Sequence, residues 1–267
     1  MTLFDQDTLP SGPLGPLVRV KLLVAYDGTG FSGFAPNPGV KTVGGVLRTS
    51  LERILRHQVP LVCAGRTDAG VHGWGQVVTF DTSSDGLELP RLVRSLNLMC
   101  APSIVVRAAE LVDPSFDARR SARARCYRYT VLNRPVADPF LARTAWHVPD
   151  PLDLSLLRLG CDGLIGVHDF SSFCRKPKSA ADAEAPSMTR DVHDARWLDL
   201  GDGILRFDIE ASSFCQQMVR AIVGTLVDMG LGKRTPGEMT SIIEARVRSA
   251  ASGVAPPHGL VLWEVTY

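Results

Sequence analysis

Residues 63–80, CAGRTDAGVHGWGQVVTF, place a glycine-rich loop between two stretches that have strand character, residues 61–63 and 76–81. Apart from His72, the only ionisable side chains within the loop are those of Arg66 and Asp68. Glycine permits unusual backbone angles and the close approach of a ligand. We therefore expect a constrained loop that presents Asp68 as a catalytic carboxylate. A second interpretation stays open, in which Asp68 caps a helix or stabilises a turn.

The sequence around this loop predicts a first α/β domain. Residues 17–26 alternate between apolar and polar and favour a strand, and Thr42 is a candidate N-cap for a helix that follows. A helix over 92–100 and a strand over 103–111 complete the pattern. We expect residues 17–112 to form an N-terminal domain that carries the Asp68 loop. Residues 1–16 are expected to be a flexible N-terminal tail.

Residues 113–267 predict a second domain of similar plan. The expected strands are 126–132, 192–200, 204–211 and 259–267, and the expected helices are 152–165, 214–229 and 238–247. Gly201-Asp202-Gly203 is a hairpin signal between two of these strands. Hairpin connections favour antiparallel pairing, so the predicted fold class is α/β (α+β). We expect two similar units, each with a mostly antiparallel sheet packed against helices.

Composition excludes several classes of protein. Of the 267 residues, 45% are hydrophobic and 21% are charged, which is typical of a globular chain. No apolar run reaches the length of about 18 residues that spans a bilayer, and the first 15 residues lack a signal-peptide pattern. A cytoplasmic location follows as an expectation. The six cysteines contain no C-x-x-C pair, so we expect free buried thiols and no metal site.

The net charge of +1 is low for a protein that binds nucleic acid, but the positive charge is clustered. Residues 119–128 contain five arginines and no acid, and Arg175, Lys176 and Lys178 form a second cluster in a polar stretch, 175–186, that is expected to be a mobile loop. Such clusters can bind phosphate. The alternative is a solvated face with no ligand.

Residues 28–33, GTGFSG, fit the G-x-G-x-x-G pattern of a dinucleotide site. That fingerprint requires a helix to begin within the motif, whereas Pro36 and Pro38 follow directly. We expect a shaped loop near a ligand rather than a cofactor site. A small-molecule dinucleotide enzyme remains an alternative function.

Arg220 is the only charged residue in 213–227, a segment expected to be a helix buried nearly all round. A buried guanidinium needs a carboxylate, because an unpaired buried charge is costly. Asp68 is a candidate partner, and such a pair would keep the carboxylate ionised. The alternatives are pairing with Glu210 or Asp228, or a side chain that extends to the surface.

Ordered motifs make the chain similar to the tRNA pseudouridine synthase A family. The chain contains Tyr26-Asp27-Gly28-Thr29, then 65–72 (GRTDAGVH), 127–129 (YRY), 168–170 (HDF) and 218–220 (MVR), followed by Ala255-Pro256 and Gly259-Leu260. The matches run in order from about Val18 to Tyr267. Departures from the family pattern concern the RNA groove and the choice of target site, and they include two positions near the first motif. Phe34-Ala35 stand where the family usually has Trp-Gln, and Gly44 stands where it usually has Gln.

The resemblance implies roles for five residues. Asp68 corresponds to the essential aspartate, Tyr127 to the aromatic that stacks on uracil, and Arg220 to the basic partner of the aspartate. Leu260 corresponds to the apolar residue at the catalytic floor, and Arg66 to the arginine that helps displace the target base.

The resemblance also implies an isomerase that converts uridine to pseudouridine at positions 38–40 of the tRNA anticodon stem-loop by base flipping. It implies no cofactor and no metal, a homodimer, and an active-site cleft between the two units, with the second domain completing the RNA-binding surface. The competing hypothesis is an RNA-binding protein that keeps the groove without the chemistry.

Overall fold

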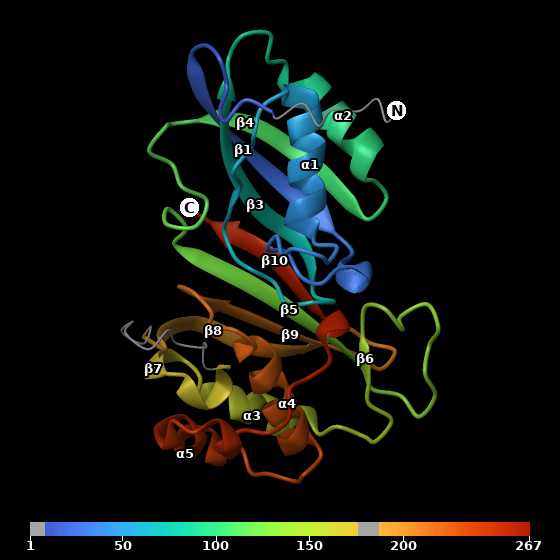
Figure 1. Ribbon diagram of the computed structural model, residues 1–267. Coiled ribbons are helices and arrows are strands. Elements are labelled where there is room, and N and C mark those ends of the chain that lie inside the picture. Colours follow the sequence, from blue (N-terminus) through green and yellow to red (C-terminus); the bar gives the residue numbers. More distant parts are fainter. Residues whose placement is uncertain (1–8, 176–186) are drawn as a thin grey trace. The chain divides into compact units, whose positions relative to one another are not determined.

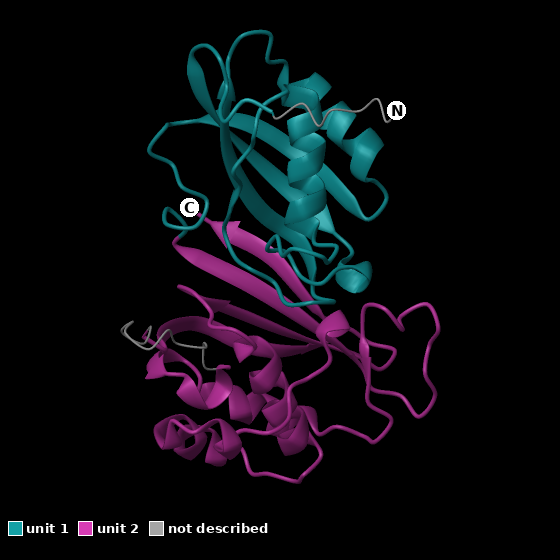
Figure 2. Ribbon diagram, viewed as in Figure 1, with its two compact units in different colours: residues 1–122 teal, residues 123–267 magenta. Residues whose placement is uncertain are grey.

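The computed structural model describes residues 9–175 and 187–267. The chain divides into two compact units, residues 1–122 and residues 123–267 (Figure 2). Each unit combines an antiparallel sheet with helices. The predicted α/β (α+β) class with mostly antiparallel sheets is therefore confirmed. In the described part of the chain no helix is long and apolar enough to cross a membrane.

Unit 1 is built on the strand order β4-β1-β3, with β2 paired to β3, all antiparallel. Helices α1 and α2 lie against one face of this sheet (Figure 1). The bounds are β1 Leu17–Tyr26, α1 Val43–Leu55, β2 Val62–Cys63, β3 His72–Ser83, α2 Leu89–Cys100 and β4 Ile104–Val112. The expected strand over 17–26 is confirmed with both ends as predicted.

Alternation along β1 builds the core of unit 1. Val20, Leu22 and Val24 are fully buried and belong to the same hydrophobic cluster as Leu47 of α1 and Leu96 of α2. Burying each such side chain contributes about 1.5–3 kcal/mol relative to leaving it exposed. The helix α1 begins where predicted, because the Thr42 hydroxyl accepts a hydrogen bond from Gly45 N at 3.1 Å.

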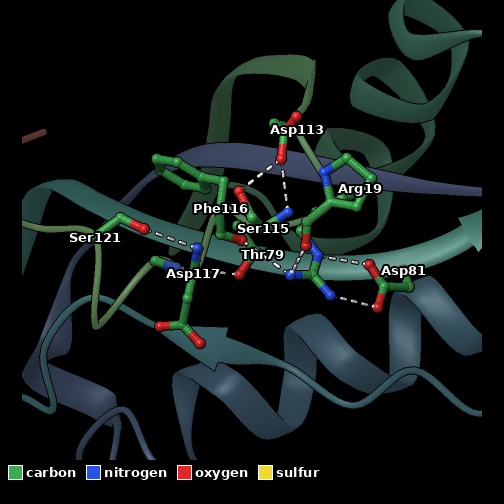
Figure 3. Close-up of polar contacts among 10 residues, drawn as sticks. Arg19, Thr79, Asp81, Asp113, Ser115, Phe116, Asp117 and Ser121 are labelled. Carbon is green, nitrogen blue, oxygen red and sulfur yellow. Dashed lines mark hydrogen bonds and ion pairs between the residues drawn. The ribbon is translucent and has the colours of Figure 1, made fainter.

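The segment 113–122 lies with unit 1, whereas we expected the second domain to begin at residue 113. Arg19 of β1 explains this, since its guanidinium binds the Asp81 carboxylate twice at 2.7 Å and donates to the carbonyls of Pro114 and Phe116 (Figure 3). Lys21 lies over the Phe116 ring at 5.4 Å. The compact units therefore divide after Ala122 rather than after residue 112.

The start of the chain is only partly described. Of the expected flexible tail over 1–16, residues 1–8 lie outside the described residues. Pro10 O and Pro16 O each accept a 2.9 Å hydrogen bond, from Gln58 N and Ser84 N. The described end of this segment is therefore attached to unit 1.

Unit 2 has the strand order β10-β5-β9-β8-β7, all antiparallel, with the short β6 parallel to β5. The bounds are β5 Ala124–Leu132, β6 Trp146–His147, α3 Leu154–Asp162, β7 Gly166–Asp169, β8 Thr189–Asp199, β9 Ile204–Ala211, α4 Met218–Gly230, α5 Glu238–Ala245 and β10 Leu260–Thr266 (Figure 1). The hairpin between β8 and β9 turns as predicted, since Gly201, Asp202 and Gly203 all have positive φ.

The helix α4 is enclosed on nearly all sides, as predicted, with 11 buried residues among its 13. It starts at Met218, however, and not at residue 214. Gln217 adopts a left-handed conformation with φ of 66°, and Met218 N bonds to Cys215 O at 3.2 Å, so residues 215–218 form a turn at the start of the helix.

The cysteine prediction is wrong for one pair. Cys174 and Cys215 form a disulfide with a Cα–Cα distance of 5.7 Å, within the range that a disulfide requires. Arg175 N bonds to Gln216 O at 3.0 Å, so the two segments run side by side. The other four cysteines are free, and burial raises the pKa of Cys161 to about 12. The rest of the predicted loop, 176–186, with Lys176 and Lys178, lies outside the described residues.

Candidate functional site

Asp68 lies in the connection between β2 and β3 and begins a tight turn. Val71 N bonds to Asp68 O at 3.2 Å, and Gly70 takes the positive φ of 78° that the third position of such a turn requires. The main chain itself closes this turn. Asp68 is half-buried in this turn.

A second glycine-rich loop interlocks with this one. Phe34 N bonds to Thr67 O at 3.2 Å, and Gly70 N bonds to Phe31 O at 3.3 Å. Gly33 has φ of 93°, and a Cβ there would lie 2.8 Å from Thr67 O. A Cβ on Gly28 would overlap the Val71 carbonyl. These glycines are therefore needed for contact between two loops.

The same residues exclude the context of a dinucleotide site. Gly28–Gly30 forms a short 3-10 turn, and the helix that follows starts at Val43, beyond the motif. The fingerprint requires its helix to begin at the glycines so that a pyrophosphate can meet the helix N-terminus. The predicted shaped loop is present, and its nearness to a ligand stays a prediction, while the cofactor alternative loses its structural basis.

A buried polar network supports the Asp68 loop from below. The Tyr26 and Thr67 hydroxyls are 2.8 Å apart, and Gln76 Nε2 donates to Gly65 O at 2.7 Å. Burial raises the pKa of Tyr26, so its hydroxyl stays protonated. His72 is buried, and its Nδ1 accepts from Gly28 N at 3.0 Å, so it connects the two loops. Sequence reasoning missed Tyr26, Thr67 and Gln76 as supporting residues.

Arg66 is exposed at the rim of the loop. Burial raises the pKa of Cys63, while the charges of Arg66 and Arg119 act in the opposite direction, so both guanidinium groups lie near this thiol. Arg119 belongs to the predicted arginine run. Two cations are thereby gathered beside the segment that carries Asp68.

The arginine run over 119–128 does not form one continuous stripe. Arg119 and Arg120 are exposed on a turn of unit 1. Arg125 is buried in unit 2 and donates to Ser212 O at 2.7 Å. Arg128 lies 3.6 Å from the Asp208 carboxylate and its guanidinium stacks 3.7 Å from the centre of the Trp263 ring. The run is therefore divided between exposed positions on the turn before β5 and structural positions on β5 itself.

Tyr127 and Leu260 lie on neighbouring strands of unit 2. In the pairing of β5 with β10, Leu260 is opposite Tyr129 and Leu262 is opposite Tyr127, so the four side chains share one face of the sheet. Tyr127 is 7% exposed and meets Phe214 edge-to-face at 5.1 Å. Tyr129 is fully buried and donates to Pro256 O at 2.8 Å, so it packs in the core of unit 2.

Arg220 lies in the first turn of α4. Its Nε donates to Ala255 O at 2.7 Å, and Ala255 N donates back to Arg220 O at 3.1 Å. The positive charge of Arg220 lowers the pKa of Tyr129 against the larger raising effect of burial, so the two side chains are close. Tyr127, Arg220 and Leu260 thus belong to one region of unit 2.

The alternative carboxylate partners of Arg220 are engaged elsewhere. Glu210 contacts His193 Nδ1 at 3.4 Å, and Asp228 contacts Lys233 at 3.9 Å. Arg66 and Asp68 are brought together in unit 1. The predicted pair between Asp68 and Arg220 joins residues of different units and stays a prediction.

His168 and Asp169 have local roles. His168 Nε2 contacts Ile165 O at 2.8 Å. Asp169 Oδ1 accepts from Ser171 N at 2.9 Å at the start of a short 3-10 turn, Ser171–Phe173. The hydrogen bond from the Ser171 hydroxyl lowers the pKa of Asp169. The Asp169 side chain therefore binds the first residue of this turn.

Comparison with known proteins agrees with the motifs. Residues 161–267 match a family model described as tRNA pseudouridine synthase. A tRNA pseudouridine synthase A from an Exiguobacterium species is 41% identical, covering 93% of this chain and 98% of that protein. Proteins of the same name from Brevibacillus brevis and Bacillus subtilis are 41% and 40% identical, covering 93% and 94% of this chain and 99% of each relative. The chain therefore belongs to the tRNA pseudouridine synthase A family and is an isomerase.

Proposed function

We propose that the chain isomerises uridine to pseudouridine at positions 38–40 of the tRNA anticodon arm, with Asp68 as the catalytic carboxylate. The observation that carries this proposal is the Asp68 turn, which is held by a second glycine loop and a buried hydroxyl network. A rigid backbone fixes the position of a reacting group, and this reduces the entropic part of the barrier.

The reaction balances without any added group. The C1′–N1 bond breaks, the uracil turns, and a C1′–C5 bond forms. The hydrogen on C5 leaves to solvent as N1 takes up a proton. The carboxylate of Asp68 adds either to the base or at the sugar, and in both cases it must be ionised. No electron is gained or lost, so the proposal includes no cofactor and no metal.

The other site residues act on the target base. Flipping the uridine out of its stack costs a few kcal/mol, and an aromatic plane recovers part of this. In the proposal Tyr127 stacks on the uracil and Leu260 forms the apolar floor. Arg66 helps to displace the base, and Arg220 keeps Asp68 ionised. The shared sheet face of Tyr127 and Leu260 supports the first two roles.

The proposal includes a homodimer and a cytoplasmic location. Support for an interface comes from the connection between β5 and β6, where Val136 is 77% and Phe140 is 93% exposed. Large exposed apolar side chains close in sequence are typical of contact surfaces. Light scattering of Phe140→Asp beside the wild type would test this, since loss of an interface halves the molar mass.

The reaction is tested with unmodified tRNA transcripts carrying tritium at uracil C5. Separate transcripts hold uridine at position 38, 39 or 40 alone. We expect tritium release by the wild type and by Asp85→Asn, a control in which an exposed acid of unit 1 is neutralised. Asp68→Asn should release none. Tight tRNA binding without release from any transcript would instead support the RNA-binding hypothesis.

A further inference from the structure

Unit 1 contains a groove that has no part in the chemistry described above. It encloses about 960 Å³ beside α1, and it is walled by the preceding segment, including Pro36 and Pro38, and by Met99 at the end of α2. Three basic residues line it, Lys41, Arg48 and Arg53, and all are exposed. None of its lining residues is acidic.

The nearby acid on α1 does not neutralise this groove. Glu52 Oε1 accepts a hydrogen bond from Val59 N at 3.2 Å, and its distance to Arg48 Nε is 3.9 Å. A surface pair at such a distance is worth less than about 1 kcal/mol. The groove therefore keeps an excess of positive charge and favours a polyanion.

Side chains rather than helix amides supply this charge. At the start of α1, Val43 N and Gly44 N donate to the carbonyls of Gly33 and Phe34 at 3.1 and 2.8 Å, and Gly45 N donates to the Thr42 hydroxyl. These donors are already used. A ligand in the groove must be held by the ends of basic side chains.

The arrangement fits an extended phosphate chain better than a single ion or a stacked base. Arg48 and Arg53 are separated by about 7.5 Å of rise along α1, and Lys41 lies before the helix with its ammonium 4.9 Å from the centre of the Phe31 ring. The cations are therefore distributed along the groove. No aromatic residue lines it, so bases have no stacking platform.

The groove is connected to the Asp68 loop through the backbone. Phe34 bonds with its N to Thr67 O and with its O to Gly44 N. A Cβ on residue 44 would lie 2.7 Å from Phe34 O, so this connection requires Gly44. Both residues are departures from the usual family sequence. Through these two hydrogen bonds, the backbone at the wall of the groove is linked by way of Phe34 to the loop that carries Asp68.

We propose that this groove binds the phosphodiester backbone of the substrate tRNA, a contact that rests on the function proposed above and adds a second binding point in unit 1. Phosphate contacts carry no sequence information but fix the register of the nucleic acid. A tRNA backbone bound in the groove would be aligned relative to Asp68, because the groove wall and the Asp68 loop are hydrogen-bonded to each other.

The test measures tRNA binding in an Asp68→Asn background, so that turnover does not interfere. Lys41→Glu with Arg53→Glu reverses two charges of the groove. The control is Arg91→Glu with Arg94→Glu, the same charge change on the exposed face of α2 outside the groove. Affinity for an unmodified tRNA transcript is measured over a series of salt concentrations, and circular dichroism checks that each variant is folded.

We expect the groove variant to bind at least tenfold more weakly than the control at low salt. The slope of log K against log salt should fall by about 1.4–1.8, since each lost phosphate contact removes about 0.7–0.9. If the groove variant does not fold, Lys41→Gln with Arg53→Gln replaces it, with the same direction of change. Equal affinity and slope in groove and control variants would overturn the proposal.

Competition and turnover distinguish a polymer site from a small-anion site, and the groove from the chemistry. If millimolar inorganic phosphate displaces tRNA from the wild type but not from the groove variant, the groove is a site for small anions. That result would refute the proposal that it binds the backbone of a polymer. If the wild type releases tritium but tRNA binds equally well to the groove variant, only the proposed role of the groove is refuted. Groove-dependent binding without release would refute the isomerase function and leave the groove in place.

Discussion

Replacing Tyr26 with phenylalanine removes one hydroxyl from beneath the Asp68 loop. Tyr26 is 5% and Thr67 is 8% exposed, and their oxygens are 2.8 Å apart. The ring keeps its apolar contacts, including Phe34 at a centroid distance of 5.8 Å, so hydrophobic burial is unchanged. The loss is the cost of leaving the Thr67 hydroxyl without this partner, about 1–3 kcal/mol.

A double-mutant cycle makes this estimate specific. Thr67→Val leaves the Tyr26 hydroxyl without its Thr67 partner at a similar cost. In the double variant both hydroxyls are absent, so neither is left buried without the other. We expect the double variant to lose less stability than the sum of the two singles, with a coupling of at least about 1 kcal/mol. Thr67→Ser, which keeps the hydroxyl, should retain most of the stability.

Hydrogen exchange of peptides from β1 and β3 measures this loss within unit 1, where a whole-chain melt would average two units. We also expect the single variants to lower kcat for tRNA while the Kd stays within a factor of two, since the loop is loosened but the basic surfaces are intact. Additive stabilities in the cycle would show that the two hydroxyls do not support each other, and the reasoning would fail.

Two further perturbations probe the loop and the attachment of 113–122. Gly33→Ala should destabilise unit 1 by about 2 kcal/mol or more, because it combines strain at positive φ with a Cβ 2.8 Å from Thr67 O. Gly30→Ala, whose Cβ meets nothing within 4 Å, should cost less than about 1 kcal/mol. Equal hydrogen-exchange protection of unit 1 peptides in the two variants would contradict this. Hydrogen bonds from the amide of Arg120 and its neighbour lower the pKa of Asp117. The carboxylate therefore stabilises the fold above its unfolded pKa of about 3.9, and this contribution is lost as pH falls through the folded pKa. The stability gap between wild type and Asp117→Asn should close between pH 5 and pH 2, and a gap independent of pH would refute the assignment.

Local patterns were sufficient to predict most of the elements. The strand β1 and the strand β9 have the predicted ends, because alternation and the turn signals at 201–203 are properties of neighbouring residues. The same is true of the Thr42 cap. The candidate site residues came from motif resemblance and from the isolated charge of Arg220, and the structure adds the hydrogen bonds of Arg220 to Ala255 that no local pattern encodes.

What could not be predicted depends on contacts between distant residues. The Cys174–Cys215 pair is separated by 41 positions, and only the fold brings the two segments together. The attachment of 113–122 to unit 1 depends on Arg19, which is 95 residues from Pro114. The late start of α4 follows from the left-handed Gln217, a conformation that its residue type does not favour.

The backbone around Asp68 is held by contacts from three separate segments. Tyr26, Phe34 and Gln76 each bond to the backbone or a hydroxyl of the loop that carries Asp68, and Gly33 leaves room for Thr67 O. A side chain at residue 44 would displace the Phe34 carbonyl, and that carbonyl belongs to the residue whose amide binds Thr67 O. Gly44 is therefore coupled to Phe34, and we expect a single return to the usual glutamine at 44 to disturb the loop that carries Asp68.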